Sequence, residues 1–183
     1  MSLEEELSVA GEAAAGHAAD GEQIVAVIPA EPGTGARVYL CAYARGEERT
    51  WLALDAAGRP VADRVLVRDA VAIATMCELA EESAGGGDVG ELRARLVELR
   101  LTESPEGIEE AEVAAAALQE AILPPPRVAS VAYLDALGQA ASRLEHALGE
   151  VGGSPFAEAL KAGVTAADDL ADDVERAYKL PLG

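Results

Sequence analysis

The densest group of side chains that could do chemistry is an acidic string near the C-terminus, Asp168-Asp169-Leu170-Ala171-Asp172-Asp173. Residues four apart lie on one face of a helix, so the carboxylates of Asp168 and Asp172 could share a Mg²⁺ ion, which prefers oxygen ligands. Arg176, one turn further on, would instead pair with Asp172 and leave the string as a solvated helix face. We expect the solvated face and no bound cofactor, and we keep a metal site at Asp168 and Asp172 as the alternative.

The histidines and cysteines do not complete a recognisable catalytic or metal-binding group. A di-iron helical bundle needs Glu-x-x-His pairs, whereas neither His17 nor His146 has a glutamate three positions before it. Cys41 and Cys77 lie among apolar neighbours without ligand spacing, which is typical of small buried side chains. The glycine-rich turns match neither a phosphate-binding loop nor a nucleophile elbow. These features favour a protein that is not an enzyme.

Composition narrows the classes of partner. The 183 residues include 33 acidic and 14 basic ones, a formal net charge of −19, so phosphate backbones would be repelled over most of the surface. One Trp and one Phe leave few aromatic side chains on which bases could stack. No apolar run approaches the roughly 20 residues that a membrane span needs, and the start of the chain does not resemble a secretion signal. We expect a cytoplasmic protein that binds neither nucleic acid nor membranes.

In the first half of the chain, the elements that must position these residues change from helix to strands. Helical periodicity over 2–17, with a capping box at its start, gives way to β-rich runs separated by hairpin-length turns. These runs are 24–28, 37–43 and 50–54. Consecutive runs should pair as an antiparallel meander. Residues 61–67 could form a fourth strand or lead into the helix that the pattern predicts over 68–83. Residues 1–84 therefore predict a helix, a three- or four-stranded antiparallel sheet and a packing helix.

The second half of the chain, 88–183, predicts only helices. Apolar residues recur there at three- and four-residue spacing, which predicts a bundle-like packing and makes the expected fold class α+β. The clearest stripes are Ile108, Ala111, Ala115, Leu118 and Ile122, and Leu134, Leu137, Ala141, Leu144 and Leu148. The prolines at 124–126 cannot continue a helix and predict a rigid hinge. We expect regions 1–84 and 88–183 to pack together as one compact unit.

The middle β-rich run offers the most suggestive surface. Its residues alternate between two faces, so Arg37, Tyr39, Cys41 and Tyr43 share one face while small apolar residues share the other. If the small residues pack on helices, an exposed surface remains whose composition is favoured at binding hot spots. That candidate interface consists of Arg37, Tyr39, Tyr43 and Trp51. In the alternative, the aromatic side chains belong to the core.

The order helix, three strands, helix is similar to that of double-stranded RNA-binding domains, which the acidic charge opposes. It also resembles that of acidic secretion-chaperone-like proteins, although the long helical half does not fit them. We expect a non-catalytic acidic protein-interaction or assembly protein, whose partner is another protein or a second copy in a homodimer. The alternative is a metal-dependent enzyme or small-ligand-binding protein that uses its acidic helix faces.

Overall fold

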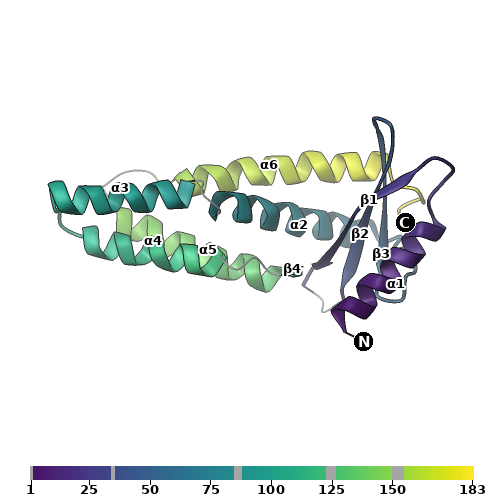
Figure 1. The fold of residues 1–183 in the computed structure, drawn as a ribbon, viewed down its shortest axis with the longest axis horizontal. Coiled ribbons are helices and arrows are strands. Elements are labelled where there is room, and N and C mark those ends of the chain that lie inside the picture. Colours follow the sequence, from purple (N-terminus) through teal and green to yellow (C-terminus); the bar gives the residue numbers. More distant parts are fainter. Residues whose placement is uncertain (1, 34–35, 85–87, 123–126, 150–154) are drawn as a thin grey trace. The chain divides into compact units, whose positions relative to one another are not determined.

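The computed structural model describes the chain except for residues 1, 34–35, 85–87, 123–126 and 150–154, and it describes side chains outside 80–88 and 150–163. The described elements form a mixed α+β fold, as expected (Figure 1). The helices are α1 (Leu3–Gly16), α2 (Arg64–Ala84), α3 (Asp88–Thr102), α4 (Ile108–Ile122), α5 (Val131–Leu148) and α6 (Pro155–Arg176). The strands are β1 (Gln23–Glu31), β2 (Val38–Arg45), β3 (Glu48–Asp55) and β4 (Ala129–Ser130).

The chain forms two compact units. Unit 1 comprises Met1–Thr75, Arg127–Val131 and Ala166–Gly183, and unit 2 comprises Met76–Pro126 and Ala132–Thr165. Unit 1 therefore contains the sheet, α1, the start of α2 and the end of α6. Unit 2 contains α3, α4 and nearly all of α5. The hinge expected at 124–126 lies outside the described residues.

The sheet is mixed, which corrects the expectation of a purely antiparallel meander. The strand order is β3-β2-β1-β4, and β1 pairs with β2, and β2 with β3, in the expected antiparallel manner. The fourth strand is β4, which pairs with the last two residues of β1 in parallel. Because β4 follows α4 in the chain and does not follow β3, it returns to the far edge of the sheet by a long connection. Such a connection permits parallel pairing.

Residues 61–67 form the approach to a helix and contribute no strand. The carboxylate of Asp63 accepts hydrogen bonds from the backbone N–H groups of Val65 and Leu66, at 3.0 and 3.3 Å. An aspartate in this position satisfies the first amides of a helix, which have no partner within the helix itself. The apolar pattern of this segment therefore belongs to α2, which starts at Arg64.

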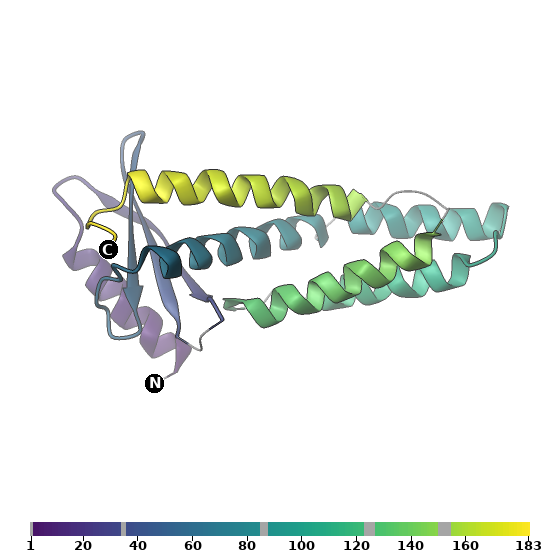
Figure 2. The same ribbon diagram turned by 180° about the vertical axis from the view of Figure 1, so that it is seen from behind.

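Helices cover both faces of the sheet (Figures 1 and 2). On one face, Ala10 and Ala14 of α1 pack in a core with five buried sheet residues, which are Tyr39, Cys41, Tyr43, Leu52 and Leu54. Alternation along β2 directs Val38, Leu40 and Ala42 to the opposite face, where they are also buried. The parts of α2 and α6 that belong to unit 1 lie on that side. The sheet is therefore the middle layer of unit 1.

Unit 2 has a separate apolar core. It is built from residues of α3, α4 and α5, among them Val89, Leu92, Leu96, Ile108, Leu118, Ile122, Leu137 and Leu144. The five residues of the predicted α4 stripe are all buried, because three- and four-residue spacing keeps them on one side of the helix.

Over the residues that the structure describes, no helix is long and apolar enough to cross a membrane.

Candidate functional site

The aromatic residues of the candidate sheet interface lie inside the protein. Tyr39 and Tyr43 have no exposed surface, and Trp51 exposes only 8%. The hydroxyl of Tyr43 donates a hydrogen bond to the backbone oxygen of Ala14 at 3.0 Å, because α1 lies directly on this face. The structure thus has the alternative arrangement, in which the aromatic side chains form the core. Tyr39 and Tyr43 offer no surface to a partner in this conformation.

Arg37, the fourth residue of that candidate interface, holds α1 against the sheet. Its guanidinium forms ion pairs with Glu6 of α1 at 2.7 Å and with Glu31 of β1 at 2.6 Å. The hydroxyl of Tyr39 donates to the same Glu6 carboxylate. This hydrogen bond and the one from Arg37 keep the pKa of Glu6 below its usual value, while burial raises the pKa of Tyr39 to about 12. The side chains of this cluster bond to one another, and they stabilise the position of α1.

A second polar cluster attaches the C-terminal segment to unit 1. The ammonium of Lys179 pairs with Glu22, donates to the backbone oxygen of His17 at 2.8 Å and lies 3.8 Å from the ring centre of Tyr43. Glu22 also accepts a hydrogen bond from Thr50. These bonds, led by that from Lys179, lower the pKa of Glu22 to about 2. Because the carboxylate is held by several donors, it serves as an anchor.

The acidic string of α6 is a helix surface, and part of it contacts α2. Asp172 pairs with Arg68 of α2 at 3.1 Å, so the partner expected for it, Arg176, is instead at Asp173. Asp168 is exposed one turn away. Within the part of the chain that the structure describes, no group of three or more His, Cys, Asp or Glu side chains could hold a metal ion. The described geometry gives a metal at Asp168 and Asp172 no further ligand.

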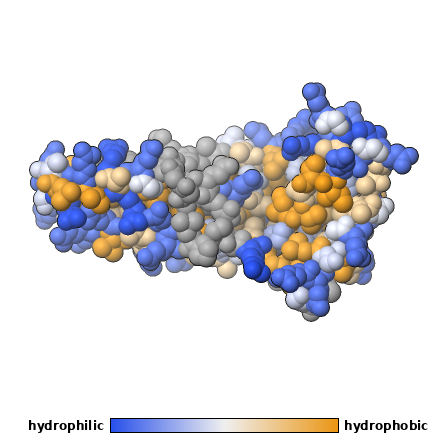
Figure 3. All heavy atoms as spheres, in the orientation of Figure 1, coloured by the Kyte–Doolittle hydropathy of each residue, from blue (hydrophilic) through white to orange (hydrophobic). Residues whose placement is uncertain are grey.

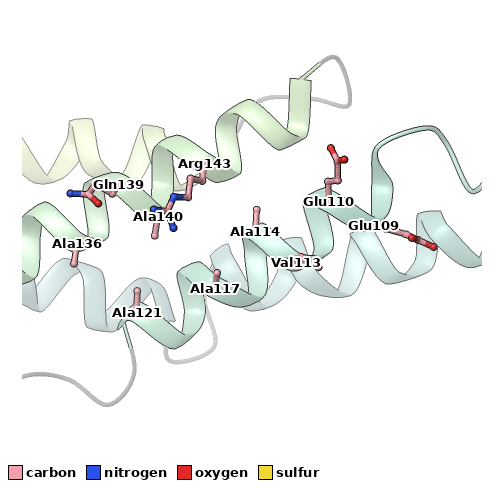
Figure 4. Close-up of a pocket in the computed structure, with 10 residues that line it drawn as sticks. All are labelled: Glu109, Glu110, Val113, Ala114, Ala117, Ala121, Ala136, Gln139, Ala140 and Arg143. Carbon is pink, nitrogen blue, oxygen red and sulfur yellow. The ribbon is translucent and has the colours of Figure 1, made fainter.

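A hollow that could receive a partner lies in unit 2, between α4 and α5 (Figure 4). Its volume is about 640 Å³. Methyl groups of both helices point into it, from Ala114, Ala117 and Ala121 on α4 and from Ala136 and Ala140 on α5. Side chains this small cannot fill the space between two helices, so an open apolar groove remains along the pair.

Charged and larger side chains border this α4/α5 groove. Val113 lies on its α4 side with 70% of its surface exposed. Glu109 and Glu110 stand at the end formed by the first turn of α4, and Arg143 extends from α5 toward α4. The groove therefore combines an apolar floor with an acidic end.

The sequence contains a signal for this groove that its periodicity alone does not reveal. Ala114, Ala117 and Ala121 follow the same three- and four-residue spacing as the buried stripe, displaced by one helical position. A second apolar stripe beside the first widens the apolar surface beyond what one neighbouring helix covers. Alanine is so common in this chain that the second stripe does not stand out.

No protein-family model, no curated protein and no solved structure matches this chain. The role of the α4/α5 groove is therefore inferred from its shape and its charge. The side chains of the polar clusters in unit 1 contact one another, whereas the groove is open.

Proposed function

We propose that this chain is a non-catalytic protein-interaction protein, and that the α4/α5 groove binds an amphipathic helix of another protein. The observation that carries the proposal is the apolar groove of about 640 Å³ with Val113 exposed beside it. Recognition of a helix in a groove uses apolar residues of the ligand at helical spacing, which enter a channel between two helices of the receptor. Small residues such as Ala117 let the backbone of a third helix come close.

The charge around the groove indicates which kind of partner helix it can bind. The groove ends at Glu109 and Glu110, and the chain as a whole carries a net charge of −19. An acidic helix would be repelled as it approached, whereas lysines or arginines at one end of the ligand would meet the two glutamates. Complementary charge accelerates association and excludes wrong partners more than it adds affinity. We therefore assign the partner helix an apolar face and a basic end.

A pair of synthetic peptides tests the proposal. Each has about 18 residues, enough to span the groove, with leucines at helical spacing. One carries lysines at the end that meets Glu109 and Glu110, and the other carries glutamates there. Fluorescence anisotropy with the full-length protein should show binding of the lysine peptide at low salt, weaker binding as salt rises, and no binding of the glutamate peptide. If neither peptide binds, or if both bind equally, the proposed function fails.

A matched pair of variants locates the binding site. Ala117→Gln places a longer polar side chain in the groove at an exposed helix position, so folding should be retained. Ala94→Gln makes the same change at an exposed position of α3 that does not line the groove. We expect Ala117→Gln to weaken peptide binding by at least about tenfold, roughly 1.4 kcal/mol, and Ala94→Gln to leave it unchanged. Equal affinities for the two variants would place binding elsewhere.

A further inference from the structure

The two edges of the sheet in unit 1 differ in a way that bears on self-association. An edge strand carries backbone N–H and C=O groups that point away from the sheet, and these groups can pair with another strand. At the outer edge of the second half of β3, residues of the same chain occupy these positions. At the outer edge of β1, the two-residue strand β4 pairs only with Ala30 and Glu31.

Every outward residue in the second half of β3 has partners from its own chain. The N–H and C=O of Trp51 bond to Ala177 and Lys179, at 3.0 and 2.9 Å. The N–H of Ala53 donates to the hydroxyl of Tyr178 at 2.8 Å, and its C=O accepts from Val61 at 2.8 Å. The N–H of Asp55 bonds to Arg59, and its C=O accepts from Gly58. This stretch of the edge has no backbone group left for a second molecule.

The register of the sheet shows which groups of β1 point outward. The backbone N–H and C=O groups of Trp51 and Ala53 point away from β2. Those of their partners on β2, Ala42 and Leu40, must therefore point toward β1. Ala42 and Leu40 pair with Ala26 and Ile28 of β1, whose backbone groups therefore point toward β2. Alternation then directs the N–H and C=O of Val27 outward, together with the C=O of Pro29. The parallel pairing of Ala30 with Ala129 occupies the C=O of Pro29. Over the described residues, no hydrogen bond from the chain reaches the two groups of Val27.

The side chains of β1 make this edge apolar and locally neutral. From Gln23 to Pro29 the strand has no charged residue, and Val25, at the bulge between Ile24 and Ala26, is 53% exposed. Apolar side chains gather over the sheet in the space-filling view (Figure 3). Each acid at the two ends of this run has a cationic partner within the chain, since Glu22 pairs with Lys179 and Glu31 shares Arg37 with Glu6. A second strand of the same sequence would therefore meet no charged side chain between Gln23 and Pro29.

We infer that β1 pairs with β1 of a second copy of this chain, joining the two sheets across a two-fold axis. Because the second half of the β3 edge is occupied, we assign the pairing between copies to β1, and an interface of like with like closes at two subunits. Pairing runs within Gln23–Ile28, since β4 occupies the edge from the C=O of Pro29 onward. The two-fold sheet uses the outward groups of Val27 in both subunits and covers Val25.

Two substitutions on β1 test this pairing without touching the bonds to β2. Val27→Pro removes an outward N–H, and Pro29 already shows that proline is accepted at an outward position of this strand. Val25→Lys adds a charge at an exposed position of the edge. Its control, Val65→Lys, makes the same change at a site of α2 that is 68% exposed. Both variants add one positive charge to a chain of net charge −19, so a difference between them reports the position of the lysine and not the change in net charge.

Sedimentation equilibrium and hydrogen exchange give the readout. The wild-type protein and Val65→Lys should sediment at twice 18.8 kDa in the micromolar range, with the Val27 amide of the wild type exchanging more slowly as concentration rises. Val27→Pro and Val25→Lys should weaken the dimer by at least about tenfold while circular dichroism stays unchanged. A wild-type species of 18.8 kDa throughout this range overturns the inference. A dimer that persists in a folded Val25→Lys variant also overturns it.

Discussion

Replacing Tyr178 with Phe should loosen the outer edge of β3, because one hydroxyl serves two backbone groups there. The hydroxyl accepts a hydrogen bond from the N–H of Ala53 at 2.8 Å and donates to the C=O of Val61 at 2.6 Å. Ala53 is fully buried, whereas Val61 is half-buried and its oxygen can turn to water. The variant therefore leaves one buried N–H without a partner. Phenylalanine retains the ring, so the packing against β3 is otherwise preserved.

The expected cost follows from these two groups. A buried donor without a partner costs about 1–3 kcal/mol, and a hydrogen bond exchanged for water costs less, so Tyr178→Phe should lower the free energy of opening this edge by about 2 kcal/mol. A change of this size speeds exchange of the Ala53 amide by about 30-fold, since 1.4 kcal/mol corresponds to a factor of about ten. Native-state hydrogen exchange is the appropriate assay, because two compact units need not unfold in a single transition.

A matched tyrosine in unit 2 provides the control. Tyr133 donates to the backbone oxygen of Ile122 at 3.1 Å, so Tyr133→Phe makes the same chemical change away from the sheet. It should leave the exchange of Ala53 unchanged and alter exchange in unit 2. If the Ala53 amide in Tyr178→Phe exchanges within a factor of about two of the wild-type rate, the hydroxyl does not hold this edge and the reasoning fails.

Three further predictions concern the cores and the acids. Leu137→Asp should destabilise unit 2 by about 3 kcal/mol or more, because it introduces an unpaired carboxylate at a position that is 2% exposed, and denaturant midpoints should rank it far below His146→Ala. With its pKa lowered from 4.5 to about 2, Glu22 should contribute stability that is complete above pH 4.5 and is lost as the pH falls toward 2. Urea midpoints between pH 2 and 6 should therefore vary less in Glu22→Gln. We expect Asp168 and Asp172 to form no Mg²⁺ site. Titration calorimetry should therefore detect no micromolar Mg²⁺ binding to the wild-type protein that is lost in the double variant Asp168→Ala with Asp172→Ala.

The parts of the fold that sequence predicts well are those specified by local spacing. The helical stripe from Ile108 to Ile122 creates one surface that has to be buried, so element type and buried face follow together. For β2 and β3 the local pattern predicts the element type alone, since consecutive residues of both strands are buried. The hairpin turns then fix neighbouring strands as antiparallel partners. These features depend on residues within a few positions of one another, which is why no knowledge of the tertiary structure is needed.

Long-range pairing sets the limit of such prediction. Ala129 and Ser130 are too few to produce an alternating pattern, and they form a strand only because the chain returns to β1 after α4. The burial of Tyr39 and Tyr43 depends in the same way on α1, since both faces of β2 are apolar enough to be core. Likewise, the outward direction of Val27 follows only from the register that β2 and β3 share.

The distribution of compensated charge explains why unit 1 and unit 2 suit different partners. In unit 1, Arg37, Arg68 and Lys179 are each paired with acids of the same chain, and Arg37 and Lys179 bind the acids at the two ends of β1. An identical strand can then approach β1 in spite of the net charge of −19. In unit 2, no such pair compensates Glu109 or Glu110 over the described residues, so the α4/α5 groove favours a basic ligand over a second acidic copy. Added salt screens the repulsion between two acidic copies and should not weaken dimerisation, whereas binding at the groove should weaken strongly.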